Sequence, residues 1–138
     1  MTALLDTSFL FSLADTDDHH HTQVLATAQT LHEPLVLAVP VLPEICYLLS
    51  TRLGHAAMRH FLAELIESDV ELASLEKSDL PRVHALLTQY ADARLDFTDA
   101  ALTAIAERRG VKRILTLDRR DFLLIRPLHC SCFEVLPA

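Results

Sequence analysis

Glycine is scarce in this chain, and its scarcity excludes two common kinds of nucleotide-binding protein. The two glycines, Gly54 and Gly110, lie far apart, whereas dinucleotide-binding and P-loop motifs need several glycines close together. We therefore expect no glycine-rich phosphate loop.

Long apolar runs are also missing. No stretch approaches the ~18 apolar residues of a transmembrane helix. The start of the chain lacks the basic segment of a signal peptide, and Asp6 interrupts its first apolar run. These absences predict a cytoplasmic protein that contacts no membrane. Hydrophobic residues make up 51% of the 138 positions, which argues against disorder and predicts one domain covering residues 1–138.

Cysteine and positive charge are limited too. The three cysteines, Cys46, Cys130 and Cys132, are odd in number and fit no zinc template, so they are predicted to be free thiols. The net charge of −7 seems to oppose a nucleic-acid partner, but one segment is locally basic. Its residues are Arg108, Arg109, Lys112, Arg113, Arg119, Arg120 and Arg126. They could hold phosphates, although a solvated surface role is as good an interpretation for any one of them.

Strand-like and helix-like segments alternate along the sequence. Strands are predicted at 2–6, 35–39, 70–75, 113–117 and 133–136, the last at an edge. A helical turn is predicted at 9–13, and helices at 18–32, 43–53, 55–67, 78–90 and 98–109. This alternation predicts an α/β/α sandwich with a mostly parallel central sheet.

Four acids occupy equivalent places in this pattern. Asp6, Glu44, Asp99 and Asp118 each lie where a predicted strand or turn passes into a helix. The carboxyl ends of parallel strands face one crevice, so these side chains can converge. Converging carboxylates need a cation, and oxygen ligands suit Mg²⁺ or Mn²⁺. The pattern predicts a metal site for phosphate chemistry.

Each acid also has a structural interpretation. Asp6 or Asp99 could cap a helix, Glu44 could interact with a helix dipole, and Asp118 could belong to a turn. The shared position of all four makes a common site the better hypothesis.

The order and spacing of several short motifs resemble the PIN-domain family, and most closely VapC-type toxins of prokaryotic toxin–antitoxin pairs. The resemblance covers nearly the whole chain. It rests on Leu4–Leu10, Pro43-Glu44, Asp96–Leu102, Ala106–Gly110 and Leu115–Phe122.

The resemblance implies a Mg²⁺- or Mn²⁺-dependent endoribonuclease that acts on RNA, is blocked by a cognate antitoxin and commonly forms a homodimer. The family's acidic quartet would be Asp6, Glu44, Asp99 and Asp118, with Asp96 as an accessory acid. Candidate auxiliary residues near metal or substrate are Thr7, Ser8, Thr116 and Arg119.

Two other functions are left open by the sequence. An acidic-site phosphatase is one, although aspartyl-nucleophile enzymes usually have a second acid where Ser8 stands. A PIN-like protein-binding module with unused chemistry is the other. The run His19-His20-His21 is predicted to be structural, because consecutive helical residues point in different directions.

Overall fold

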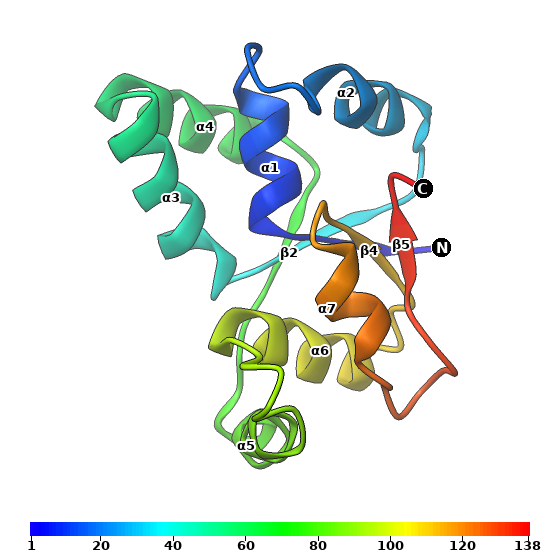
Figure 1. Ribbon diagram of the computed structural model, residues 1–138. Coiled ribbons are helices and arrows are strands. Elements are labelled where there is room, and N and C mark those ends of the chain that lie inside the picture. The colour runs from blue at the N-terminus through cyan, green and yellow to red at the C-terminus, as the bar shows by residue number, and fades with distance from the viewer.

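The computed structural model describes residues 1–138 and has a five-stranded sheet between two layers of helices (Figure 1). The strands are β1 (Ala3–Leu5), β2 (Leu35–Ala38), β3 (Glu71–Ala73), β4 (Arg113–Leu115) and β5 (Glu134–Leu136). The helices are α1 (Thr7–Ala14), α2 (His21–Thr30), α3 (Val41–Arg52), α4 (His55–Glu67), α5 (Leu80–Gln89), α6 (Phe97–Arg109) and α7 (Arg119–Leu124), with a 3₁₀ turn η1 (Lys77–Asp79) before α5. None of these helices combines the length and apolarity needed to cross a membrane.

The strand order is β3-β2-β1-β4-β5, and every neighbouring pair is parallel. From β1 the chain proceeds to β2 and β3 on one side, then returns to add β4 and β5 on the other. The order therefore reverses between β1 and β4. In open parallel sheets, ligands bind beyond the carboxyl ends of the strands at such a reversal.

The two helical layers follow from this strand order. Figure 1 shows α1 to α4 on one side of the sheet and α5 to α7 on the other. Right-handed crossovers require this arrangement, because a chain that reverses its direction along the sheet must cross on the opposite face. The predicted α/β/α sandwich is confirmed, and its sheet is parallel throughout.

Burial is greatest in the central strands and in α6. All three residues of β1 are buried, as expected for a strand that is flanked on both sides and covered on both faces. In α6, every residue from Ala100 to Ala106 is buried, and its alanines let the helix pack closely against α5. Gly110 ends α6 with a φ of +68°, a left-handed conformation that favours glycine.

The helix predictions differ from the structure in several places. The helix predicted at 18–32 is shorter, since α2 covers only His21–Thr30, and residues 78–79 of the helix predicted at 78–90 belong to the 3₁₀ turn η1. The residues 9–13, predicted as one turn, belong to the complete helix α1, and helix α3 begins at Val41 rather than near Pro43. Pro43 is accommodated because N–H groups in the first turn have no partner within a helix. Helix α7 was not predicted at all. The edge position predicted for the last strand is confirmed by β5.

Candidate active site

The ends of β1 and β4 bring two of the predicted acids to the point where the strand order reverses. Asp6 directly follows β1, and its N–H donates to the carbonyl oxygen of Leu115 at 3.0 Å. This bond extends the β1–β4 ladder by one residue. It brings Asp6 beside the segment Thr116–Asp118, which leads from β4 into α7.

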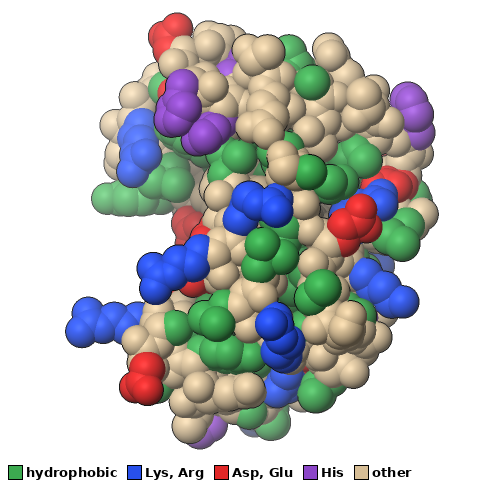
Figure 2. Space-filling view, turned by 45° about the vertical axis from the view of Figure 1, so that its right-hand side comes forward, with side chains coloured by type: hydrophobic (Ala, Val, Ile, Leu, Met, Phe, Trp, Pro, Cys, Tyr) green, Lys and Arg blue, Asp and Glu red, His purple; other side chains and the backbone are tan.

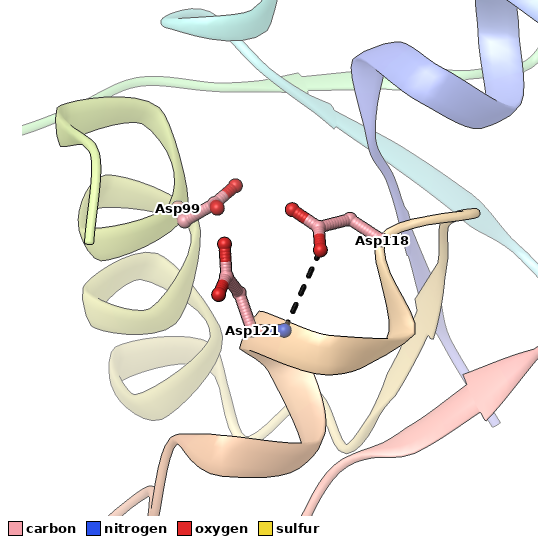
Figure 3. Close-up of side chains that lie close together, drawn as sticks. All are labelled: Asp99, Asp118 and Asp121. Carbon is pink, nitrogen blue, oxygen red and sulfur yellow. Dashed lines mark hydrogen bonds between the residues drawn. The ribbon is translucent and has the colours of Figure 1, made fainter. Parts of the chain in front are cut away.

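Three carboxylates form the tightest acidic cluster. One oxygen each from Asp99, Asp118 and Asp121 lies within 4.8 Å of the other two. Figure 3 shows Asp99 projecting from α6 toward Asp118 and Asp121, which come from the start of α7. Asp118 caps α7, and its Oδ1 accepts a hydrogen bond from the N–H of Asp121 at 3.4 Å. The start of α7 thus positions two of the three side chains.

Asp6 is joined to the start of α7 by a chain of hydroxyl groups. The Thr116 hydroxyl donates to Oδ2 of Asp6 at 2.7 Å and accepts from the N–H of Asp118 at 2.9 Å. The Ser8 hydroxyl lies 3.0 Å from the Thr116 hydroxyl and donates to the same Oδ2 of Asp6 at 3.4 Å. Ser8 in turn accepts from the N–H of Leu117 at 2.9 Å. All the donors in this relay are directed toward Asp6.

Glu44 approaches the site from a different element. It lies in the first turn of α3 and is half-buried. The Thr98 hydroxyl, at the start of α6, donates to its Oε2 at 3.0 Å. This bond connects two helices on opposite sides of the sheet and leaves Oε1 of Glu44 available. Glu44 is also close enough for its charge to raise the pKa of Asp6.

Burial and mutual repulsion keep protons on these acids. Burial, followed by the charges of Asp6, Asp96, Asp118 and Asp121, raises the pKa of Asp99 to about 9. Burial also raises the pKa of Asp6 to about 6, against the lowering effect of the Thr116 hydrogen bond. The pKa of Asp118 is raised by burial and then by the charge of Asp121.

The donor set fits a divalent cation. None of the ion pairs in the protein involves a carboxylate of the cluster or Asp6, so no side chain neutralises their charge. Carboxylate oxygens with no nitrogen or sulfur ligand suit hard cations that keep part of their water shell. Asp99, Asp118 and Asp121 could hold such an ion, with Asp6 directly beside them.

Comparisons with known proteins agree with this geometry. The family model described as the PIN domain matches residues 3–126. The chain belongs to the PIN-domain family.

Proteins similar to this PIN domain include a ribonuclease and several solved structures with the same fold. Ribonuclease VapC26 of Mycobacterium tuberculosis is 34% identical over 97% of this chain and 99% of its own length. The fold is similar to that of VapC20, a sarcin–ricin loop cleaving toxin of M. tuberculosis, with a TM-score of 0.80 and 20% identity over 86% of this chain and 91% of that one. It is also similar to a DNA-bound VapBC structure from Salmonella typhimurium, with a TM-score of 0.68 and 14% identity over 98% and 96% of the two chains.

Asp96 and Thr7, two further predicted site residues, lie outside the carboxylate cluster. Asp96 is exposed and caps α6, where its Oδ1 accepts a hydrogen bond from the N–H of Asp99 at 2.9 Å. Thr7 is buried at the start of α1, and its hydroxyl has no hydrogen-bond partner. Any role of these two residues toward a metal or substrate stays a prediction.

Most arginines of the basic segment in this PIN domain have partners within the protein. Arg108, Arg109 and Arg113 lie at the end of α6 or the start of β4 and form ion pairs with Asp79, Glu71, Glu33 and Glu134 of other segments. Arg119 follows Asp118, but its guanidinium donates to the carbonyl oxygens of Val135 and Pro137, at 3.3 and 2.8 Å. The four side chains therefore stabilise the fold, and contact of Arg119 with substrate remains a prediction.

The histidine run and the cysteines lie outside the carboxylate site. The backbone N–H of His20 donates to Asp18, and the ring of His21 contacts the carbonyl oxygen of Ser12 at 2.8 Å. These bonds are structural contacts of His20 and His21, but His19 and His20 lie in the turn before α2 rather than on a helix as predicted. All three cysteines are free, as predicted.

Sequence reasoning missed Asp121 and Thr98 as parts of the site. A signal for Asp121 was present, because Asp118 and Asp121 repeat the three-residue spacing of Asp96 and Asp99. In each pair, the first acid caps a helix and the second lies in its first turn. For Thr98 no signal existed, since its contact with Glu44 joins residues 54 positions apart.

Proposed function

We propose that this PIN domain is a metal-dependent endoribonuclease that hydrolyses RNA phosphodiester bonds as the toxin of a toxin–antitoxin pair. The observation that carries the proposal is the convergence of Asp6, Asp99, Asp118 and Asp121 at the reversal of strand order, without a neutralising side chain. The ribonuclease relative, matched over almost its full length, supports the same activity.

The proposed cofactor is Mg²⁺ or Mn²⁺. Asp99, Asp118 and Asp121 would bind the ion, with Asp6 and Asp96 as further ligands, directly or through water. Such an ion supplies positive charge to the phosphoryl oxygens and lowers the pKa of a water molecule. Hydrogen bonds hold two of these carboxylates in place. Asp6 accepts from the Thr116 hydroxyl, and Asp118 accepts from the N–H of Asp121 at the start of α7.

Glu44 is the proposed residue that orients the attacking water. The Thr98 hydroxyl fixes Oε2 of Glu44, so that Oε1 can accept a hydrogen bond from water and direct its lone pair toward the phosphorus. Ser8 and Thr116 keep Asp6 in position through the hydroxyl relay. Cleavage breaks the bond between phosphorus and the leaving ribose oxygen, which takes up a proton.

The proposed partner is an antitoxin protein, and the proposed place of action is the cytoplasm, where RNA cleavage would inhibit translation. Toxin–antitoxin complexes are among the proteins with this fold, including VapBC2 of Rickettsia felis and a complex from Klebsiella pneumoniae. A homodimer is part of the same proposal.

Cleavage of total cellular RNA tests the activity. Wild-type protein with Mg²⁺ or Mn²⁺ should give discrete fragments, and EDTA should abolish them. Asp99→Asn should reduce the rate by about 100-fold or more, because one cluster carboxylate is lost. Asp69→Asn, an exposed acid before β3, is the matched control and should cleave normally. Fragments that persist with Asp99→Asn would contradict the assignment of this site, and no cleavage by the folded wild type would favour a binding module.

A further inference from the structure

Four of the 12 Lys and Arg side chains of this protein form ion pairs with acids, and the others do not. Ion pairs with acids engage Arg82, Arg108, Arg109 and Arg113. The last three belong to the end of α6 or the start of β4. The guanidinium groups of these three arginines therefore hold α6 and β4 against their neighbours.

Arg94 and Arg120, near the carboxylate cluster, are different. Both are exposed and neither forms an ion pair. Arg94 lies two residues before Asp96, the cap of the helix that carries Asp99. Arg120 lies in the first turn of α7, directly before Asp121. Each of the two segments that form the cluster thus carries one free guanidinium.

These two arginines do not neutralise the acids beside them in sequence. The charges that act most strongly on Asp99 are all acidic, and no arginine is among those that act most strongly on Asp118. Figure 2 shows acidic atoms inside a recess at the left of the view, with Lys and Arg side chains projecting beside it. The positive charge therefore lies outside the recess and the negative charge within it.

The backbone at Arg94 is a second, independent observation. Its φ of +54° makes it the one residue other than glycine with a positive φ. The conformation turns the chain after α5, where the N–H of Arg94 donates to the carbonyl oxygen of Ala91 at 3.0 Å. Glycine or asparagine would adopt it at lower cost. A long charged side chain at such a position indicates a role for the side chain itself, because strained residues concentrate at functional sites.

We propose that Arg94 and Arg120 bind phosphate groups of the RNA strand on the two sides of the phosphate that is cleaved. The inference rests on the proposed ribonuclease function and adds two substrate-positioning residues to it. A net charge of −7 repels RNA as a whole, so local cations beside the cluster are needed to hold the strand against the acids. Guanidinium groups suit this role because they bind phosphate oxygens in a bidentate manner.

The salt dependence of RNA binding tests this proposal. Binding of a short, mixed-sequence single-stranded RNA would be measured at several salt concentrations. The Asp99→Asn protein would be used, because it should cleave the RNA much more slowly. Adding Arg94→Gln or Arg120→Gln should weaken binding several-fold at low salt. Each should also reduce the slope of log K against log salt concentration by about 0.7, the value for one phosphate contact with a single strand.

Matched variants separate this role from a structural one. Lys112→Gln removes an exposed, unpaired charge just before β4 and should leave the slope unchanged. Arg94→Lys and Arg120→Lys should keep it, because the charge remains. Arg94→Gly should raise the melting temperature by relieving the backbone and still weaken RNA binding. Arginine variants that behave like Lys112→Gln would overturn the proposal.

The same variants in the wild-type background distinguish this proposal from the ribonuclease function. If the parent cleaves RNA and the arginine variants raise KM with little change in kcat, both are supported. If the parent cleaves and KM does not change, the proposed function stands and the role of the arginines is overturned. If the parent binds RNA through the arginines without cleaving it, their contact with RNA phosphates is upheld. The nuclease function is then contradicted, and with it their placement beside a cleaved phosphate.

Discussion

Thr116 determines how Asp6 can behave in the site. The residue is completely buried, and its hydroxyl both donates to Asp6 and accepts from the N–H of Asp118. It therefore connects the carboxylate at the end of β1 to the backbone at the start of α7. The hydrogen bond favours the ionised form of Asp6 and opposes the effect of burial on its pKa.

Replacing Thr116 by valine should affect both stability and the pH dependence of cleavage. Thr116→Val has nearly the same shape but leaves the N–H of Asp118 without an acceptor, which should cost about 1–3 kcal/mol in the free energy of unfolding. The pKa of Asp6 should rise above about 6, so the acidic limb of the pH–rate profile should move to higher pH. Thr116→Ser keeps the hydroxyl and should retain the wild-type profile. An unshifted profile with valine would show that the relay does not tune Asp6.

The identity of the acids could be predicted from sequence, but their energetics could not. Asp6, Glu44, Asp99 and Asp118 follow a visible pattern of strand or turn, then acid. The difference between Asp6 and Asp99 in pKa depends on the depth of each side chain and on donors from distant segments, such as Thr116. No local pattern encodes these contacts.

At the level of elements, α6 has a cap that is also a candidate metal ligand. Asp96 uses Oδ1 to accept from the N–H of Asp99, which leaves Oδ2 available. Capping needs only a hydrogen-bond acceptor, whereas binding of a cation depends on charge. The two roles can therefore be separated by substitution.

Asp96→Asn and Asp96→Ala should have different effects. Asparagine caps helices about as well as aspartate, so its stability should match that of the wild type, whereas alanine should cost about 1 kcal/mol. If Asp96 supports the metal through water, the metal concentration for half-maximal cleavage should rise about tenfold with asparagine. Urea unfolding and metal titrations of activity measure the two effects. An unchanged metal requirement would reduce Asp96 to a helix cap.

The helices predicted most accurately from the sequence were those long enough for apolar residues to recur at helical spacing. Helix α6 was predicted from its apolar face and from Gly110, which the structure confirms as its end. Helix α7 spans only six residues, too few to repeat a helical pattern, and it directly follows a strand. Its cap, Asp118, resembled a turn residue for the same reason, and Asp121 was missed with the helix that positions it.

At the level of the whole molecule, the buried acids link stability to pH. Without metal, the folded protein keeps protons on Asp6 up to about pH 6 and on Asp99 up to about pH 9. The unfolded chain releases them at about pH 3.9. The folded state binds more protons across this interval, so these two groups make the free energy of unfolding fall as pH rises from about 4 to 9.

A divalent cation should reverse this trend above neutral pH. In EDTA, the melting temperature should decrease as the pH is raised from 5.5 to 8. This decrease should be smaller for Asp99→Asn. Mg²⁺ or Mn²⁺ should raise the melting temperature more at pH 8 than at pH 5.5, because binding requires deprotonated ligands. Stability in EDTA that rises with pH over this interval would contradict the pKa values assigned to the two acids.

The pairing of β1 with β4 has a consequence for how the protein is made. Asp6 and Thr116, which meet at that pairing, are 110 positions apart in the chain. Contacts between such distant segments form late in folding, because a long loop must close first. While a ribosome synthesises the intervening residues, the nascent chain holds Asp6 without Asp118 or Asp121. An N-terminal fragment released before α7 would carry no complete carboxylate cluster and should lack the proposed activity. That activity should therefore arise only after nearly the full length has been translated.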